Sequence, residues 1–411
     1  MNLKRFILPV IGEIMVPDII YKISNLPEIQ RLRHISLSNV DSCTLAAIGG
    51  VSRYEHSLGT AILAWKLSEK LGLDQDFQSE LILAAGLHDV AAPGLGHLFE
   101  EGCYLADLSF NHEKRLKEIF FEENSPYYQT FLGKELGCRK LMCDLKVSFK
   151  SVFDTIAGYD TRCKNAINGS IDLDNIDNVA RMLSRLGIAV PLESLLEFLD
   201  IFEVKNSKIV LHQVARVSFD EWLLLRKKLY NILMLEPSDF VAKTMTKQAI
   251  FLGLRNNIIK EYDWCLTDHE MYQKLINHEI TKELIERLLL ANYYRLIGLY
   301  WIEGKESIDI LKNKIKREVL HESINKRIGK GILIDYIPDK RERKIDGSSS
   351  DRALVGIISK YATPGKFEQE LCEEFIKENF TFIGKASLTG QYLQINKTDD
   401  KRQSFLPFMD K

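Results

Sequence analysis

The sequence predicts a mainly α-helical fold with small β-hairpins and a small α+β appendage at the C-terminal end. Apolar residues recur at helical spacing over most of residues 51–301, as in the run from Thr60 to Leu71 that Gly72 stops. After about residue 327, strand patterns alternate with one amphipathic helix. We therefore divide the chain into an N-terminal strand and helix segment, a helical domain with a helical extension, and the appendage, which cover residues 1–50, 51–327 and 328–411.

Periodicity and helix-breaking residues place the individual elements. Helices are predicted at residues 18–24, 27–36, 113–123, 132–156 with a break near Gly137, 192–202, 219–235, 237–252, 268–278, 281–301 and 367–378. Strands are predicted for a short strand or hairpin within residues 6–16, a pair within 204–214 that turns at Asn206 and Ser207, and single strands at 329–337 and 380–383. Helices thus account for most of the predicted structure.

Composition and charge favour a cytoplasmic protein. The formal net charge is −2 at pH 7, which gives no support to a basic nucleic-acid-binding surface, although local basic clusters are not excluded. The seven cysteines form no metal-binding spacing, and their odd number fits a reducing compartment. Residues 1–12 resemble a signal peptide only superficially, because the apolar run is short, contains Pro9 and meets Glu13. No apolar run reaches the ~18 to 20 residues of a membrane span, so no membrane contact is expected.

Histidines gather in one stretch of the chain. Four of the nine lie within residues 52–113, each beside an acid or a glycine: His56, His88, His97 and His112. His88 and Asp89 close an apolar run, and such a pair can supply one nitrogen and one oxygen ligand to a hard or borderline divalent cation. His56 can add a second nitrogen from the preceding helix. The pattern therefore predicts part of a metal site.

A further ligand is expected later in the chain, because an ion that polarises a phosphoryl oxygen needs more negative charge than one Asp gives. Residues 170–178 place three carboxylates at the start of a predicted helix. Asp172 suits a helix cap and Asp177 suits a first-turn charge, so both have structural explanations. Asp174 is left as the candidate ligand.

These motifs together resemble the HD-domain metal-dependent phosphohydrolases. The resemblance rests on five segments in order: residues 53–59 (RYEHSLG), 86–89 (GLHD), 96–100 (GHLFE), 111–113 (NHE) and 172–177 (DLDNID). It is strongest to the deoxynucleotide triphosphohydrolase branch, which includes bacterial dGTPases and the mammalian antiviral dNTPase. Residues 30–36 (QRLRHIS) also resemble the entry helix of that branch, so the likeness covers roughly residues 8 to 240.

The resemblance implies an HD-type helical bundle in which residues 51–327 form the catalytic domain. It implies one divalent cation per site, held by His56, His88, Asp89 and Asp174. Mn, Fe, Zn, Ni, Co and Mg are not distinguished, and an additional Mg²⁺ could accompany the nucleotide. Such an ion binds the α-phosphate and lowers the pKa of a bound water.

The resemblance also implies roles for residues that do not bind the metal. His112, supported by Glu100, is expected to act as the acid that protonates the leaving oxygen, and His97 is a further active-site histidine. The alternative for both histidines is a solvent-facing loop. Arg53 and Arg226 stand where the family holds substrate phosphates, and either could instead be an ordinary surface charge.

The chain departs from the branch at the positions that contact the substrate. Asn175 and Asn178 replace a Lys and a Tyr, and Met182 replaces an Asp that receives the sugar 3'-hydroxyl. Met234 aligns with the tyrosine that screens against ribose, and Ala92 replaces a histidine. We therefore keep Asn175, Asn178 and Met182 as substrate-binding positions whose contacts differ from those of the branch.

The expected function is hydrolysis of deoxynucleoside triphosphates to nucleoside and triphosphate, for nucleotide-pool control or antiviral defence. One alternative is a phosphohydrolase or phosphodiesterase that acts on another nucleotide, which the altered sugar contacts favour. Another is a regulatory module that senses nucleotides, with the appendage as its regulatory or oligomerising part. The implied partners are a nucleotide substrate, a nucleotide effector and further copies of the chain in a homo-oligomer.

Overall fold

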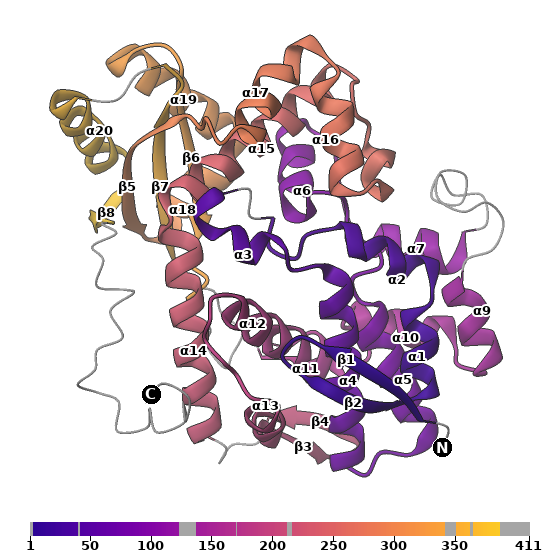
Figure 1. Ribbon diagram of the computed structural model, residues 1–411. Helices are drawn as coiled ribbons and strands as arrows, with labels where there is room; N and C mark the ends of the chain where they lie inside the picture. The colour runs from indigo at the N-terminus through magenta and orange to yellow at the C-terminus, as the bar shows by residue number, and fades with distance from the viewer. Residues whose placement is uncertain are drawn as a thin grey trace, which may run out of the picture.

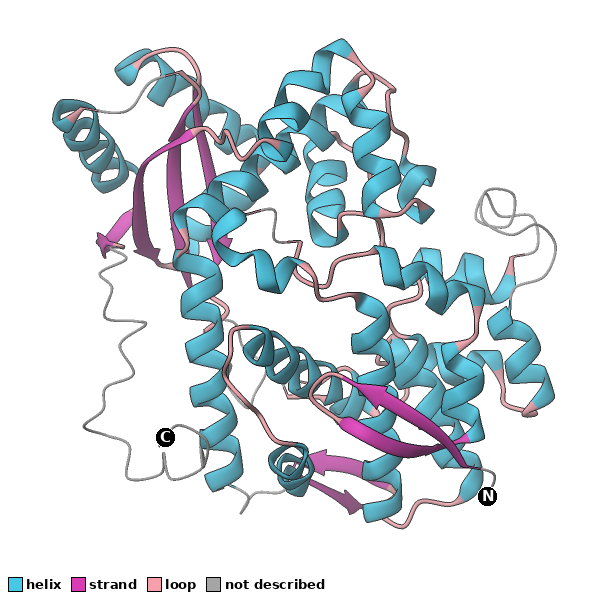
Figure 2. Ribbon diagram, in the orientation of Figure 1, coloured by secondary structure: helices cyan, strands magenta, loops and turns pink. Residues whose placement is uncertain are grey.

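Figure 1 shows the computed structural model, which describes residues 3–39, 42–122, 137–169, 171–211, 216–341, 351–361 and 365–386. Helices dominate these residues, and the strands form only small sheets (Figure 2), which confirms the predicted mainly α fold. No helix in the described ranges is both long and apolar enough to cross a bilayer.

The N-terminal segment is a β-hairpin followed by short helices. Strands β1 (Leu3–Leu8) and β2 (Gly12–Pro17) pair antiparallel, as predicted for residues 6–16. Helices α1 (Asp18–Ser24) and α2 (Pro27–Arg31), a 3₁₀ turn (Leu32–His34) and α3 (Ala46–Gly49) follow. The guanidinium of Arg31 donates to the carbonyls of Val90, Ala92 and Cys265, at 3.1, 2.7 and 3.2 Å. Arg31 therefore ties the N-terminal segment to the loop that follows the His88–Asp89 pair.

The helical body is built around α4 (Arg53–Lys70), which packs against α5 (Gln75–Leu87) and α12 (Leu173–Arg185). Side-chain caps fix where these helices begin, because Ser52, Asp74 and Asp172 each accept a hydrogen bond from a backbone N–H of the first turn. The other helices of the body are α6 (Gly96–Leu105), α7 (His112–Phe121), α9 (Gly137–Asp144), α10 (Phe149–Ile156), α11 (Lys164–Ile167), α13 (Leu192–Phe198), α14 (Arg216–Leu235), α15 (Pro237–Arg255), α16 (Asp268–Ile276) and α17 (Glu279–Leu289).

A second hairpin joins α13 to α14. Strands β3 (Phe202–Lys205) and β4 (Lys208–Leu211) pair antiparallel, and Asn206 and Ser207 between them have φ angles of 51° and 58°. Two successive left-handed residues are the mark of the tight turn whose twist suits a hairpin. The strand pair predicted around Asn206 and Ser207 is confirmed.

The C-terminal unit is a four-stranded antiparallel sheet with helices. Its elements run β5 (Arg295–Glu303), α18 (Lys305–Lys312), α19 (Lys314–Ile328), β6 (Ile332–Pro338), β7 (Arg352–Ser359), α20 (Lys366–Asn379) and β8 (Thr381–Lys385). The strand order is β6-β7-β5-β8. This β-α-β-β-α-β arrangement is the ferredoxin-like split βαβ motif.

The helix predicted at 281–301 is wrong in its second half. Helix α17 ends at Leu289, and β5 occupies Arg295–Glu303. Because both faces of this strand are covered, its sequence is a continuous apolar run that periodicity cannot distinguish from a buried helix. The predicted boundary at residue 327 consequently falls inside the α+β unit, which begins with β5.

The α+β unit shares its core with the helical body. Residues such as Leu299, Leu354 and Ile358 on one face of the sheet belong to the large core of the helical body, and the other face packs with α18, α19 and α20 in a second core. Gly356 on β7 makes the contact with α15 close, since a Cβ atom there would overlap the ring of Phe240. The sheet is therefore fixed against α15 beside the helices of the body (Figure 1).

Candidate metal centre and active-site cavity

His56 lies in the first turn of α4 and forms the centre of the site. Its side chain is 1% exposed, with Nε2 3.0 Å from Asp174 Oδ1 and Nδ1 2.8 Å from Asp177 Oδ2. Burial lowers the pKa of the ring, but its hydrogen bonds to Asp174 and Asp177 outweigh burial and raise that pKa to about 10. A divalent cation at Nε2 would have to displace the proton that this nitrogen shares with Asp174.

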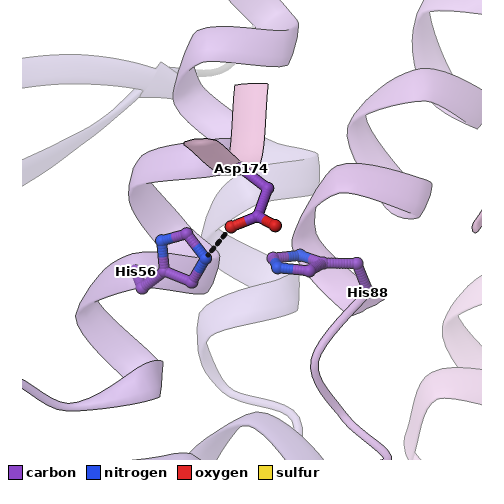
Figure 3. A group of neighbouring side chains, drawn as sticks. All are labelled: His56, His88 and Asp174. Carbon is purple, nitrogen blue, oxygen red and sulfur yellow. Dashed lines mark ion pairs between the residues drawn. The ribbon is translucent and has the colours of Figure 1, made fainter. Parts of the chain in front are cut away.

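His88 faces His56 from the end of α5. Its Nδ1 lies 2.7 Å from the carbonyl oxygen of Ala85, which can only accept a hydrogen bond, so Nδ1 carries a proton and Nε2 is the nitrogen that an ion could use. The two imidazole rings are nearly perpendicular, with centroids 5.1 Å apart. One donor atom each from His56, His88 and Asp174 lie within 4.8 Å of one another (Figure 3). Two imidazole nitrogens and a carboxylate oxygen can hold a divalent cation.

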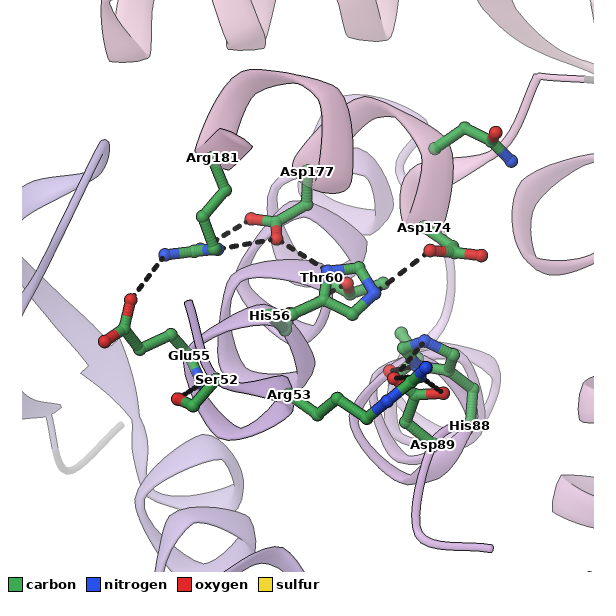
Figure 4. Close-up of polar contacts among 12 residues, drawn as sticks. Ser52, Arg53, Glu55, His56, Thr60, His88, Asp89, Asp174, Asp177 and Arg181 are labelled. Carbon is green, nitrogen blue, oxygen red and sulfur yellow. Dashed lines mark hydrogen bonds and ion pairs between the residues drawn. The ribbon is translucent and has the colours of Figure 1, made fainter. Parts of the chain in front are cut away.

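Asp177 and Arg181 form a buried layer behind His56 (Figure 4). Asp177 is 1% exposed and receives two hydrogen bonds from Arg181, at 3.0 and 2.7 Å. Burial raises the pKa of Asp177, but Arg181 and His56 outweigh it and hold that pKa below its usual value. The ionised carboxylate fixes the proton of His56 on Nδ1 and so aims Nε2 at Asp174. The first-turn role predicted for Asp177 is wrong, because α12 begins at Leu173 and the acid of its first turn is Asp174.

Gly59 has no side chain, and the side chains of Asp177 and Arg181 occupy the space beside it. It lies one turn after His56 on α4, and a Cβ atom at this position would overlap the carboxylate of Asp177 and the guanidinium of Arg181. A glycine is thus needed where the inner layer crosses α4.

Asp89 is the predicted ligand that stands apart from the cluster. Both of its carboxylate oxygens lie 2.8 Å from Nη1 of Arg53, and Oδ2 lies 3.8 Å from Nε2 of His88. Burial raises the pKa of Asp89, but Arg53, His88 and His56 outweigh burial and lower it strongly. Asp89 is therefore ionised next to His88, and its role as a ligand stays a prediction.

The predicted catalytic groups lie on α6 and α7. His97 is 62% exposed, and its Nδ1 is 3.1 Å from Oε2 of Glu100 one turn later. His112 begins α7, capped by Asn111, but its side chain lies outside the described residues, so its predicted contact with Glu100 stays a prediction. The structure places His97 on the wall of the same cavity as His56 and His88.

The predicted substrate-binding residues lie on α12 and α14. The side chain of Asn175 donates to Asp172 at 2.6 Å and accepts from Arg226 at 3.0 Å. Arg226 is 4% exposed and its guanidinium lies 4.4 Å from the centre of the Tyr230 ring, so it is not an ordinary surface charge. Asn178 and Met182 line the cavity, whereas Arg226 contacts it through Asn175.

The cavity has a volume of about 750 Å³ and joins the two parts of the molecule. His56, His88 and Asp174 line one region of it. Its wall continues along α15, with Lys243 and Lys247, to the end of β6 and the residue Lys340 just beyond. The α+β unit therefore supplies part of the cavity wall, a contribution that the sequence analysis missed because no motif marks these residues.

A second group of potential metal ligands lies elsewhere in the body. Glu80 on α5, with Asp160 and Cys163 between α10 and α11, offers three donor atoms within 4.8 Å of one another. Arg162 fills the same space, with Nη2 2.8 Å from Glu80 Oε1 and Nε 2.9 Å from Asp160 Oδ2. None of these residues lines the 750 Å³ cavity. This group is an ion-pair cluster around an arginine.

Comparison with known proteins identifies the domain that carries the site. Residues 53–146 match the HD domain, which indicates a metal-dependent phosphohydrolase. An uncharacterized protein of Methanocaldococcus jannaschii is 23% identical over 323 residues, which are 76% of this chain and 64% of that protein. This chain thus spans less than two thirds of the relative's length. Asp174 and Asp177 lie beyond the HD match, yet the fold brings both to His56.

Proposed function

We propose that this HD-domain protein hydrolyses a deoxynucleoside triphosphate to the deoxynucleoside and inorganic triphosphate. The observation that carries the proposal is the cluster of His56, His88 and Asp174 on the wall of a 750 Å³ cavity. The cavity is of the size that small-molecule ligands occupy in proteins. A divalent ion held by this cluster would polarise a phosphoryl oxygen and supply a bound water of lowered pKa.

The side chains around the cluster support this chemistry. Asp177 holds the Nδ1 proton of His56, and the carbonyl of Ala85 holds that of His88, so both Nε2 atoms face the ion position. Glu100 accepts from Nδ1 of His97 and so orients the ring of His97 on the cavity wall. His112 remains the predicted acid for the leaving nucleoside oxygen.

A second candidate is hydrolysis of another nucleotide, and the methionines favour it. Met182 and Met234 both line the cavity and are 3% and 2% exposed. A thioether cannot donate a hydrogen bond to a sugar hydroxyl, so these side chains discriminate deoxyribose from ribose only by shape. Matched dNTP and NTP pairs should therefore show a modest difference in kcat/KM, and a very large deoxy preference would argue against these contacts.

One experiment tests both candidates. The purified protein is analysed for bound metals and then incubated with a panel of dNTPs, NTPs, nucleoside monophosphates and cyclic nucleotides. Phosphate, triphosphate and nucleoside are quantified separately. Triphosphate with nucleoside supports the proposal, whereas phosphate from monophosphates or opening of cyclic nucleotides supports the second candidate. No turnover with any nucleotide at full metal occupancy would overturn both.

A further inference from the structure

The wall of the cavity carries three lysines from two parts of the chain. We call Lys243 and Lys247 of α15 and Lys340 after β6 the lysine edge. All three line the cavity that His56, His88 and Asp174 also line. Among the described residues, Arg53 is the other Lys or Arg on this wall, and its guanidinium already pairs with Asp89 at 2.8 Å. The other cations on the cavity wall are therefore those of the lysine edge.

Lys247 connects the secondary-structure elements around the lysine edge through ion pairs. It is 5% exposed, its ammonium lies 2.9 Å from Oε2 of Glu101 on α6, and it forms an ion pair with the buried Asp335 of β6. Asp335 also accepts from Thr244 at 2.8 Å and from Arg317 at 3.0 Å. Lys247 thus joins α15, α6 and β6, and its own charge is neutralised by two carboxylates.

Lys243 and Lys340 are the members that can contact a ligand. Lys243 lies 2.7 Å from Asp239, a contact that uses one of the three N–H donors of its ammonium. Lys340 is exposed, and no carboxylate in the described part of the chain lies within ion-pair distance of it. A lysine ammonium on a flexible stem is a point charge that suits phosphate oxygens.

We propose that the lysine edge binds the polyphosphate portion of the substrate, with Lys243 and Lys340 in contact with it and Lys247 as the positioning residue. This inference rests on the proposed function, in which the α-phosphate lies at the metal cluster. The β- and γ-phosphates must then extend into the remaining cavity. The edge favours ligands with two or more linked phosphates over monophosphates, and it makes the α+β unit part of the substrate site.

The test measures binding of inorganic triphosphate, pyrophosphate and phosphate to the metal-loaded full chain by isothermal titration calorimetry. Lys340→Ala should weaken triphosphate binding by roughly threefold to tenfold, as loss of one partly exposed charge contact does, and Lys340→Glu should weaken it further. Phosphate binding should change little. The matched control is Lys330→Ala, because Lys330 is also exposed but lies at the opposite end of β6, away from the cavity.

Hydrolysis of bis(4-nitrophenyl) phosphate separates the two proposals. This ester carries no polyphosphate, so its hydrolysis reports on the metal cluster alone, and the control Lys330→Ala, which lies away from the cavity, should hydrolyse it at the wild-type rate. Triphosphate binding that is the same in wild type and Lys340→Glu overturns the lysine edge, whatever the turnover. Absence of nucleotide turnover together with a Lys340-dependent triphosphate affinity overturns the proposed reaction and leaves the binding site standing.

Discussion

Within the described residues, two groups of three ligand-type side chains occur, and they differ in what lies among their donor atoms. In the group of Glu80, Asp160 and Cys163, the guanidinium of Arg162 bonds both carboxylates. In the cluster of His56, His88 and Asp174, the arginine stands one layer back, on Asp177. An arginine that lies between the carboxylates neutralises them, so no metal ion is needed there. An arginine that bonds a residue behind the ligands instead orients a ligand toward the ion position. Proximity of donor atoms alone therefore does not define a metal site.

The largest effect is expected when a carboxylate ligand of the His56, His88 and Asp174 cluster is removed. Asp174→Ala should remove the bound metal and the hydrolytic activity, because it deletes the carboxylate of the cluster. Asp160→Asn is the matched control, and it should keep both. Metal content by mass spectrometry and nucleotide turnover are measured on folded protein. Full metal occupancy in Asp174→Ala, or loss of metal in Asp160→Asn, would reverse the assignment of the two groups.

The second layer should have a smaller effect on the metal. Asp177→Asn removes the negative charge that fixes the proton of His56, so metal affinity should fall roughly 10- to 100-fold. Competition with a chelator measures the affinity. Asp76→Asn, at an exposed position in the first turn of α5, should leave it unchanged. An unaltered affinity in Asp177→Asn would show that Asp177 serves only the ion pair with Arg181.

The space behind His56 can be tested through stability. Gly59→Ala places a methyl group where the Asp177 and Arg181 side chains lie, so it should destabilise the fold by roughly 1 to 3 kcal/mol, as overpacking does. Gly50→Ala is the control, because its nearest neighbour would be an ordinary 3.8 Å from the new Cβ. Thermal melting of the two variants should differ clearly, and equal melting temperatures would contradict the close approach.

The ion pairs of Arg162 with Glu80 and Asp160 should make the stability of the fold depend on pH. Burial raises the pKa of Asp160, but the hydrogen bonds and charge of Arg162 outweigh it and lower that pKa. A lowered folded-state pKa adds stability above the unfolded-state value of about 3.9, and this stability is lost as the pH falls below it. Asp160→Asn should therefore lower the urea midpoint at pH 7 and differ less from wild type near pH 3. A constant difference across this range would be inconsistent with the ion pair.

The smallest expected effect concerns the reactivity of the Cys163 thiol in the arginine-centred group of Glu80, Asp160 and Cys163. Burial, with the charges of Asp160 and Glu80, raises the pKa of Cys163 to about 12. A thiol that stays protonated is neither a good metal ligand nor a nucleophile. Iodoacetamide at pH 8 should therefore label the exposed Cys43 and Cys143 and leave Cys163 unmodified in the folded protein. Rapid labelling of Cys163, located by peptide mass spectrometry, would contradict this environment.

The sequence predicted the ligand-type residues of the site better than what surrounds them. His56, His88 and Asp174 carry motifs, and the fold brings them together. Asp177 was assigned to its own helix, because only tertiary contacts reveal that it bonds His56. The available signal was an Asp and an Arg four residues apart among the apolar positions of a predicted helix, namely Asp177 and Arg181.

The fold shows the same division between local and distant information. The hairpins at β1–β2 and β3–β4 follow from alternation and turn residues, and they were predicted. Strand β5 was predicted as helix because a strand covered on both faces does not alternate. Lys243 and Lys340 were not predicted as site residues, since nothing local places residues almost a hundred positions apart on one cavity wall.

The hydrogen bonds of Arg31 have a consequence for how the chain reaches its active form. Arg31 precedes the HD match at residues 53–146, and it bonds carbonyls 61 and 234 residues away. Contacts between such distant positions close slowly, because a long loop of chain must be ordered first. During synthesis, the hydrogen bond from Arg31 to Cys265 can therefore form only after residue 265 has emerged, whereas the bond to Ala92 can form earlier. A fragment limited to residues 53–146 would carry the HD signature without the supports that shape its centre.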